Sequence, residues 1–481
     1  MLSEHLPGPF PLPFIGNLHL LAYKMMIKKM DLTSSMREIV QEYGSVYTFW
    51  FGPVATVHIC DYVSTVEAMV KNGTSFVNRA LPFLFESSRG GRGLLASNDL
   101  FWQEQRRFAL HTLRNFGLGR NILEERIMFE FEYTCETLEK QMENGRLSIQ
   151  PNHIIDLLVG NIINRMLFTD RFEKEEEKRF FVLKNKLDNL FDSFKPYDVL
   201  INRWTVKFPL FHRRADTLLK PQNDLLDFLG EQVQRRRKAI ADGVHILEGE
   251  GNDFVDAFLI QMEKDEKCGV KRSFDEESIC HTLLDLWAAG QETTATTLVW
   301  AFAYLLLHNN VKTRVTEELR QATKDSNRPL SLSDKVKTPY FNAVLTEINR
   351  CAAIFPLNLS RRAGEDVTIA GHVIPKGTSV TVQISLVMSD DQNFKESVKF
   401  DPDRYLNGEK IDQQVVAFGI GKRACLGETL ARAELYLIIR NFLLRYGLSA
   451  DPCHMPSMSE KSQLGIVRKT TPYHIVFSHI Q

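Results

Sequence analysis

The sequence predicts a mainly α-helical protein with small β-sheets, on the basis of two patterns and an ordinary globular composition. Amphipathic, charge-rich segments with helical spacing recur along the chain. They span 31–42, 121–144, 171–193, 222–241 and 311–324. Only short runs have the composition of strands. These runs are Ser45–Phe51, Val54–Cys60, Val367–Ile369, His372–Ile374 and Ser379–Ile384.

The composition excludes several classes of protein. Of the 481 residues, 44% are hydrophobic and 25% are charged, so a disordered or fibrous chain is not expected. Lys and Arg together number 59 against 60 Asp and Glu. This balance leaves no overall basic field, and we therefore expect no nucleic-acid partner.

The cysteines and histidines show no local metal motif. There are seven cysteines, an odd number, and no pair forms C-x-x-C. A disulfide framework or a structural zinc site is therefore not expected. The 13 histidines include no H-x-x-x-H pair, so we do not expect a multi-histidine metal site either.

Residues 1–20 form a proline-rich lead-in. Four prolines lie between Pro7 and Pro13, and they favour an extended, stiff segment rather than a packed element. No basic or long apolar run precedes them, so neither a signal peptide nor a membrane helix is expected there.

An uncharged stretch predicts a helix in the core. Thr293–Val311 contains no Asp, Glu, Lys or Arg, and Leu298–Leu307 is apolar throughout. That apolar run is shorter than the roughly 20 residues that a bilayer requires. A long helix through the core of a large protein is the better interpretation.

The most specific pattern is a glycine-rich loop around one cysteine. It contains Phe418, Gly421, Arg423, Cys425 and Gly427, and an apolar helix is expected directly after it over 429–444. Glycines allow a backbone to approach a flat metal macrocycle closely. A helix N-terminus favours a thiolate, and an arginine favours carboxylates on the macrocycle. A buried structural cysteine is the alternative, whereas a phosphate loop lacks the required Ser or Thr after Lys422.

This loop resembles that of the cytochrome P-450 family, the haem-thiolate monooxygenases. The resemblance implies the fold of that family, with haem b between a long core helix and the cysteine loop and its helix. It implies that residues 21–481 form the catalytic domain. It also implies that Cys425 is the metal ligand and that Arg423 binds a haem propionate, with Phe418, Gly421 and Gly427 around the cofactor.

A second motif, Ala289-Gly290-Gln291-Glu292-Thr293-Thr294, is expected to open the core helix. An acid beside a hydroxyl group suits the passage of protons. A threonine hydroxyl can also divert a backbone hydrogen bond and form a groove. By resemblance, Thr293 would hydrogen-bond dioxygen and Glu292 would relay protons from water. Without the cysteine loop, an ordinary helix with a polar patch would explain the motif equally well.

Two further pairs have scaffold or cofactor roles by resemblance. Glu347 and Arg350 are three residues apart at the edge of an apolar helical stripe. With Arg404 they would form a structural network that supports the cysteine loop, rather than a weak surface pair. Trp102 and Arg106 lie four residues apart and would both reach haem propionates. Asp99 replaces a glycine that the family has before this helix.

The resemblance also implies a substrate and an electron donor. The substrate pocket would be apolar and would take a lipophilic small molecule, such as a xenobiotic, a fatty acid or a steroid-like compound. Its expected lining is Phe83, Phe85, Ala289, Leu357, Leu359 and Leu464. The chain lacks a G-x-G-x-x-G dinucleotide motif, so NADPH would act only through a flavoprotein reductase. A docking patch is expected at Arg107, Arg114, Arg120 and Lys422.

The pattern is most similar to the microsomal branch that oxidises drugs and fatty acids. Pro7–Pro13 resembles the hinge that follows the membrane anchor in that branch, which implies the cytosolic face of the endoplasmic reticulum membrane. Because the chain shows no anchor, a cytoplasmic or peripheral location stays open. Membrane contact is expected through 207–214, where an apolar tip lies between cations; a loop packed on its own core is the alternative.

Three functions remain in competition at this level. The first is a monooxygenase that uses dioxygen, the second a haem enzyme that rearranges peroxides without a reductase, and the third a non-catalytic haem sensor or carrier. The Glu292-Thr293 pair favours the first, because neither alternative requires a proton relay.

Overall fold

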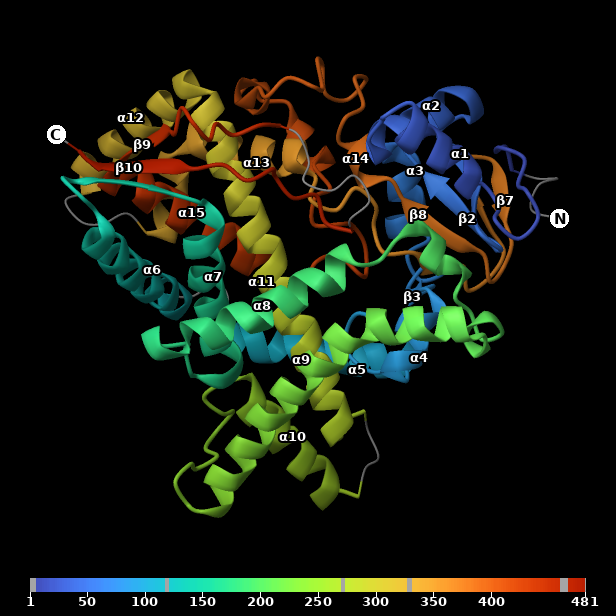
Figure 1. The fold of residues 1–481 in the computed structure, drawn as a ribbon, viewed down its shortest axis with the longest axis horizontal. Helices are drawn as coiled ribbons and strands as arrows, with labels where there is room; N and C mark the ends of the chain where they lie inside the picture. The colour runs from blue at the N-terminus through green and yellow to red at the C-terminus, as the bar shows by residue number, and fades with distance from the viewer. Residues whose placement is uncertain (1–5, 117–120, 270–272, 327–330, 459–465, 481) are drawn as a thin grey trace.

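The larger β-sheet lies at the end of the molecule that carries the N-terminus, and helices fill most of the rest (Figure 1). A computed structural model of the chain describes residues 6–116, 121–269, 273–326, 331–458 and 466–480. Its mainly helical architecture with small sheets confirms the fold class predicted from the sequence.

The helices vary from single turns to elements of more than 30 residues. They are α1 (Leu18–Ala22), α2 (Leu32–Tyr43), α3 (Tyr62–Val66), α4 (Phe83–Arg89), α5 (Asp99–Asn115), α6 (Asn121–Gln141), α7 (Pro151–Phe168), α8 (Glu177–Asp192), α9 (Pro209–Ala241), α10 (Phe254–Lys267), α11 (Glu276–Leu307), α12 (Asn309–Ser326), α13 (Pro339–Ala352), α14 (Ile384–Val387) and α15 (Glu428–Arg445).

The strands form three separate sheets. The five-stranded sheet has the order β1 (Val46–Phe51), β2 (Val54–Ile59), β8 (Ser379–Val382), β5 (Arg361–Arg362) and β3 (Asn78–Arg79), in which only β2 and β8 are parallel. A three-stranded antiparallel sheet has the order β4 (Arg146–Ile149), β10 (Ile475–His479) and β9 (Tyr446–Ala450). The hairpin of β6 (Val367–Ile369) and β7 (His372–Ile374) forms the third.

Helix α11 runs through the main core and packs on α7 and α15. Two glycines allow the contact with α7. A Cβ atom on Gly290 would lie 2.6 Å from Ile163 Cδ1, and one on Gly160 would lie 2.7 Å from Gln291 Oε1. Side chains at these two positions would force the helices apart. The core helix is therefore fixed laterally at the level of the acid–threonine motif.

The position of that motif corrects one expectation. Helix α11 begins at Glu276, where the Asp275 side chain accepts a hydrogen bond from the Ser278 N–H, and ends at Leu307. Ala289 and Thr293 consequently lie in the middle of the helix and do not open it. The first half of α11 was not predicted because it contains charged residues, such as those of its first turn, and so falls outside the uncharged stretch.

Other boundaries differ for physical reasons. The segment predicted at 222–241 is the second half of α9, which starts at Pro209 and includes Pro221. The segment at 171–193 begins with a 3₁₀ turn over Lys174–Glu176 before α8. Helix α7 was not predicted, because it is buried on nearly all sides and has no polar face to give a periodic pattern.

The proline-rich lead-in is packed, contrary to expectation. Leu6 is buried, and the Pro7 carbonyl accepts a hydrogen bond of 2.8 Å from the N–H of Thr48 in β1. The Asn17 side chain donates to the carbonyls of Pro9 and Phe10. These contacts fix the described part of the segment on the edge of the larger sheet. In the described ranges no helix is both long and apolar enough to cross a membrane.

Candidate active site

The loop before α15 positions Cys425 through short backbone hydrogen bonds. The Cys425 N–H donates to the Phe418 carbonyl at 2.8 Å, and the Ala424 N–H donates to the Gly421 carbonyl at 3.0 Å. Gly421 has φ +80°, and a Cβ atom there would overlap the Met69 carbonyl. Glycine is therefore required at this position both for the backbone conformation and for the close approach of the segment containing Met69.

The sulfur of Cys425 lies in a partly protected position. The residue is accessible to solvent, yet surrounding protein desolvates the thiol and raises its pKa, while a hydrogen bond from the Gly427 N–H lowers it. Gly427 is the N-cap of α15, so the sulfur lies next to a helix N-terminus, where a negative charge is favoured. Cys453 is also exposed, but it lies in the turn after β9 and not in this loop.

Arg423 is held beneath the loop by carbonyl groups. Its buried guanidinium donates to the carbonyls of Val77 (2.9 Å) and Ser97 (2.6 Å). It also stacks on the Trp102 ring, with 3.8 Å between its Cζ atom and the ring centroid. Arg106, one turn after Trp102 on α5, donates to the Ala424 carbonyl at 2.8 Å. The structure thus brings Trp102, Arg106 and Arg423 together beside Cys425.

Two further arginines, which the sequence does not predict, belong to this cluster. Arg79 is buried in β3 and donates to the Leu359 carbonyl at 2.9 Å. Arg361 is buried in β5, and its Nη1 atom has no hydrogen-bond partner among the described residues. The neighbouring Arg362 is exposed and pairs with Glu86. Strand alternation was the available signal, but a two-residue strand is too short to show which arginine faces inward.

Among the described residues, none of the four guanidiniums forms an ion pair with a carboxylate; Asp285 and Asp99 only partly offset the charges of Arg79 and Arg423. Burial lowers the pKa of Arg79 to about 9 and that of Arg423 to about 8, and repulsion from Arg106 adds to both shifts. Burial and the other three arginines lower the pKa of Arg361 far more. Isolated buried cations are costly unless an anion is nearby. The four arginines therefore create a region of positive electrostatic potential that favours a bound anion.

This donor set fits haem b. The two propionates of a haem would supply carboxylate charges to Arg79, Arg106, Arg361 and Arg423, and an accessible thiol lies within the same loop. The orphaned Nη1 atom of Arg361 is the specific observation in favour of an additional anion. We conclude that the chain's own residues suit a thiolate-ligated haem at this place.

The Thr293 hydroxyl bonds to its own helix. Its Oγ1 atom donates to the Ala289 carbonyl at 2.7 Å, which is the diverted backbone bond expected from the sequence. Ala289 is exposed and Thr293 is half-buried, although nearly all of α11 around them is buried. Solvent therefore reaches the core helix at this motif.

Glu292 is engaged elsewhere. Its buried carboxylate pairs with Lys184 of α8 (2.9 Å) and with Lys469 (2.7 Å). Burial opposes the charged form of both lysines, but the surrounding carboxylates outweigh it and raise both pKa values. Among the described contacts, no hydrogen bond joins Glu292 to Thr293. The Glu292 carboxylate is thus held by two lysines. It is adjacent in sequence to Thr293 but is not hydrogen-bonded to the Thr293 hydroxyl in the described structure.

Glu347, Arg350 and Arg404 meet in one buried cluster. Arg350 forms a two-pronged pair with the Glu347 carboxylate at 2.7 and 2.8 Å, and Arg404 Nε donates to the same group at 3.2 Å. The hydroxyl of Tyr405, which the sequence analysis did not single out, donates to it at 2.8 Å. Burial opposes the charge on Glu347, but the guanidinium hydrogen bonds outweigh it and lower the pKa of that carboxyl. All the charges of the network are therefore satisfied.

Asp99, which by resemblance stands where the family has a glycine, adopts a left-handed backbone conformation. Its φ is +53°, and the side chains of Asp99 and Asn78 are joined by a hydrogen bond of 2.7 Å. An aspartate tolerates this region better than most residues, because its short side chain can bond locally. The aspartate at this position consequently does not disturb α5, the helix that carries Trp102 and Arg106.

The expected pocket residues are only partly brought together. Phe83 packs against a small cluster that includes Leu218 of α9, and the Phe85 ring is tilted against that of Phe194 with 5.8 Å between ring centroids. Leu359 meets Arg79 through its carbonyl. Leu357 is half-buried on the same segment. Leu464 lies outside the described residues.

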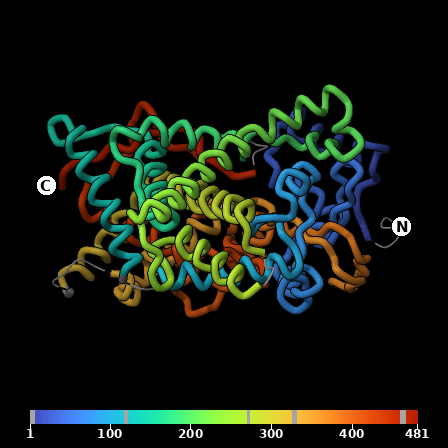
Figure 2. The backbone as a smooth tube through the Cα atoms, turned by 90° about the horizontal axis from the view of Figure 1, so that it is seen from below, coloured from blue at the N-terminus to red at the C-terminus, as the bar shows by residue number. Residues whose placement is uncertain are grey.

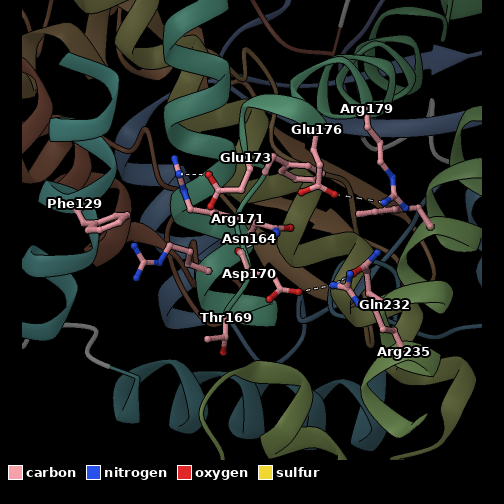
Figure 3. Close-up of a pocket in the computed structure, with 13 residues that line it drawn as sticks. Phe129, Asn164, Thr169, Asp170, Arg171, Glu173, Glu176, Arg179, Gln232 and Arg235 are labelled. Atoms are coloured by element: carbon pink, nitrogen blue, oxygen red, sulfur yellow. Dashed lines mark hydrogen bonds and ion pairs between the residues drawn. The ribbon is translucent and has the colours of Figure 1, made fainter. Parts of the chain in front are cut away.

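A separate polar groove of about 480 Å³ lies among α6, α7, the turn before α8, and α9 (Figure 3). Phe129, Arg171 and Arg235 belong to its lining, whereas none of the predicted site residues does. Arg171 pairs with Glu173 at 2.8 Å, and Arg235 pairs with Asp170. Because its cations already have carboxylate partners, the groove shows no unbalanced charge for a cofactor.

Comparison with known proteins gives a consistent result. The profile of one family, described as Cytochrome P-450, matches residues 6–477. The chain is 36% identical over 445 residues to the probable cytochrome P-450 cyp-35D1 of Caenorhabditis elegans, covering 92% of this chain and 88% of that protein. It is 34% identical to cytochrome P-450 2C23 of Rattus norvegicus (92% and 87% covered) and 31% identical to cytochrome P-450 2B2 of the same species (98% and 93% covered).

The matched residues include the cysteine loop, the arginine cluster and the core helix, and the match extends over nearly the whole chain. The chain therefore belongs to the cytochrome P-450 family of haem-thiolate monooxygenases.

Proposed function

We propose that Cys425 is the thiolate ligand through which this protein, a haem-thiolate monooxygenase of lipophilic small molecules, holds its haem. The single observation that carries the assignment is the group of four arginines around the Cys425 loop, none of which is ion-paired with a carboxylate in the part of the chain that the structure describes. When bound, the haem activates dioxygen so that one oxygen atom enters the substrate and the other forms water.

The protein residues then have distinct tasks. The Gly427 N–H stabilises the negative sulfur of Cys425, and Gly421 gives the clearance that the loop requires. Arg79, Arg106, Arg361 and Arg423 would bind the propionates, with Trp102 packed under Arg423. The network of Glu347, Arg350 and Arg404 holds the chain that leads to the loop, since Glu347 also accepts from the N–H of Asp401 at 2.9 Å.

Thr293 and Glu292 are proposed to supply protons. The Thr293 hydroxyl proton, now bonded to the Ala289 carbonyl, is available to a reacting oxygen at the exposed stretch of α11. Glu292, which is paired with Lys184 and Lys469, follows directly before Thr293 in the chain and is the proposed acid of this relay. This relay favours the monooxygenase over peroxide rearrangement or haem sensing.

The substrate would lie against apolar groups on the side of the exposed α11 stretch. Phe83, Phe85, Ala289, Leu357 and Leu359 are the proposed contacts. A lining of this composition orients a lipophilic molecule through few polar interactions.

The redox partner is proposed to be an NADPH-dependent flavoprotein reductase. Arg107, Arg114 and Lys422 are exposed near the cysteine side, and Arg120 of the expected patch lies outside the described residues. A basic patch would attract an acidic reductase. Reduction rates measured at 20 and 300 mM salt should fall as salt increases; equal rates would rule out this docking mode.

The endoplasmic reticulum membrane is the proposed location, with contact through 207–214. Phe208 and Leu210 are 62% and 78% exposed. The adjoining loop lies beside the N-terminal segment, because a Cβ atom on Gly52 would be 2.9 Å from Leu200 and 3.5 Å from the Phe14 carbonyl (Figure 2). Phe14 in the N-terminal segment is also exposed, and exposed apolar side chains of this kind favour contact with a membrane surface.

The assignment of Cys425 is tested by spectroscopy of the purified protein. Cys425→Ala should lose the absorption band that a thiolate-ligated, reduced haem gives with carbon monoxide, while Cys453→Ser, which alters another exposed thiol, should keep it. A Cys425→Ala protein with an unchanged band would overturn the assignment.

A further inference from the structure

The second, three-stranded sheet carries a cluster of metal-binding side chains at one edge. Asp451 directly follows β9, and His474 directly precedes β10, its neighbour in the sheet. His454 lies on the turn between them. One ligand atom from each of these three side chains lies within 4.8 Å of the other two.

The distances suit a shared ion. Asp451 Oδ2 is 3.7 Å from His454 Nδ1 and 3.9 Å from His474 Nδ1. Two ligands of a tetrahedral zinc ion, each about 2.0–2.2 Å from the metal, are separated by roughly 3.3–3.6 Å. Shifts of a few tenths of an ångström would therefore bring both Asp451–histidine pairs to this separation. The ligand atoms of the two histidines lie within 4.8 Å of each other. His454 is 55% exposed on its turn and can make this adjustment.

The backbone and neighbouring groups already orient the cluster. The His454 N–H donates to the Asp451 carbonyl, and the His474 N–H donates to the His454 carbonyl, both at 3.0 Å. The Asp451 carboxylate accepts from the Cys453 N–H at 2.8 Å and from the Ser148 hydroxyl at 2.5 Å. Hydrogen bonds of this kind to a carboxylate ligand are typical of the surroundings of metal sites.

The cluster differs from the other histidine–carboxylate contacts of the chain. His479 with Glu139 and His212 with Asp216 are single pairs, each with one imidazole. Within the described residues, only Asp451, His454 and His474 bring three such ligands together. The two imidazoles are also stacked, with 4.2 Å between their ring centroids.

We propose that Asp451, His454 and His474 form a site for a borderline-soft divalent transition-metal ion, of which Zn²⁺ is the probe, separate from the haem. Two imidazoles and one carboxylate select Zn²⁺ over Mg²⁺ or Ca²⁺, which prefer oxygen ligands. The ion would replace the weak 3.3 Å contact between Ser148 and His474 Nδ1. It would also tie the end of β9 to the start of β10.

The sequence concealed this site because its ligands are far apart along the chain. His454 and His474 are separated by 20 positions and therefore do not form an H-x-x-x-H pair. Antiparallel pairing of β9 with β10 brings them together.

Isothermal titration of the haem-loaded protein, purified without a histidine tag, tests the proposal. Zn²⁺ should bind the unmodified protein at this site, and His454→Ala or Asp451→Asn should weaken that binding at least tenfold. His479→Ala, which removes an exposed histidine from β10 of the same sheet, should bind as the unmodified protein does. His454 is exposed, so its replacement leaves the fold intact, as an unchanged haem spectrum would verify.

A second measurement is independent of titration heats. Zn²⁺ binds the folded state, so it should raise the thermal unfolding temperature of the unmodified and His479→Ala proteins, but not that of His454→Ala. Mg²⁺ should raise none of them. Equal Zn²⁺ affinity in all variants, or weakening by His479→Ala as large as that by His454→Ala, would overturn the proposal.

Discussion

The buried guanidinium of Arg361 has a role that a single substitution can reveal. If Arg361 binds a propionate as we propose, Arg361→Met removes one charge-assisted contact, and such contacts contribute about 1.5–3 kcal/mol. Haem should therefore transfer to an excess of a high-affinity haem acceptor about tenfold faster or more. Arg362→Met, which alters the exposed neighbour, is the matched control. Equal transfer rates from both variants would contradict the assignment of Arg361 to the cofactor.

The Thr293 hydroxyl is expected to couple electron use to substrate oxidation. Thr293→Ala should keep the thiolate-type carbon monoxide band but divert most NADPH equivalents to hydrogen peroxide. The Thr297 hydroxyl lies one turn further along α11 and donates to the Thr293 carbonyl at 2.8 Å. Thr297→Ala should therefore stay coupled. The ratio of peroxide to product distinguishes the two, and a coupled Thr293→Ala enzyme would exclude the relay.

Residues in one local motif were predictable, and residues assembled from distant segments were not. Phe418 to Gly427 lie within ten positions, so their chemistry could be recognised together. Arg79 and Arg361 reach the same cluster from β3 and β5, which pair only in the folded sheet. Their inward orientation depends on that pairing and has no signature in either segment alone.

At the level of elements, the α7–α11 contact depends on two glycines. Gly160→Ala would place a methyl group against Gln291 and the Phe180 ring, and overpacking of this kind costs about 1–3 kcal/mol. Gly230→Ala in α9 meets nothing nearer than Cys280 Sγ at 4.0 Å, so its better helix propensity should be neutral or stabilising. Thermal unfolding of the two variants at one heating rate measures the difference. A Gly160→Ala protein as stable as Gly230→Ala would refute the packing argument.

Helix α15 contains a buried acid that makes stability depend on pH. Glu434 is fully buried, its carboxyl oxygens have no well-formed hydrogen bond, and burial raises its pKa to about 8 despite the nearby Thr294 hydroxyl. The unfolded chain releases this proton near pH 4.5, whereas the folded protein keeps it until about pH 8. Folding stability should thus fall between these values, by at most about 1.4 kcal/mol per pH unit.

Glu434→Gln removes this titration while keeping the shape of the side chain. The variant should become progressively more stable than the unmodified protein as the pH rises from 5 to 8. Thermal unfolding of both proteins across that range checks the prediction. A stability difference that does not change with pH would show that the carboxyl group is ionised in the folded state.

The predictability of an element followed from its exposure. Helices with one polar face, such as α2 and α12, were found within about two residues of their ends. Helix α7 lacks such a face and was missed, and the small sheet of β4, β9 and β10 depends on pairing between distant segments. Periodicity reports the boundary between core and solvent, so an element wholly inside the core gives no signal.

At the scale of the whole molecule, the exposed apolar face that carries Phe208 and Leu210 should determine membrane binding. Replacing Phe208 and Leu210 by Glu should strongly reduce flotation with phosphatidylcholine–phosphatidylserine vesicles, because charged side chains are costly in the interface. Val398→Glu, at a side chain that is 86% exposed, is the control and should have no effect. Unreduced flotation of the double variant would show that this face does not hold the protein on lipid.

The arginine cluster has a consequence for the life of the newly synthesised chain. Three buried arginines and the half-buried Arg106 repel one another, and this repulsion opposes closure of β3, β5 and the start of α5 until an anionic partner arrives. The haem-free chain should therefore stay partly unfolded at β3, β5 and the start of α5, where cellular proteases can cleave it. The supply of the prosthetic group would then govern abundance, because only chains that capture it escape degradation.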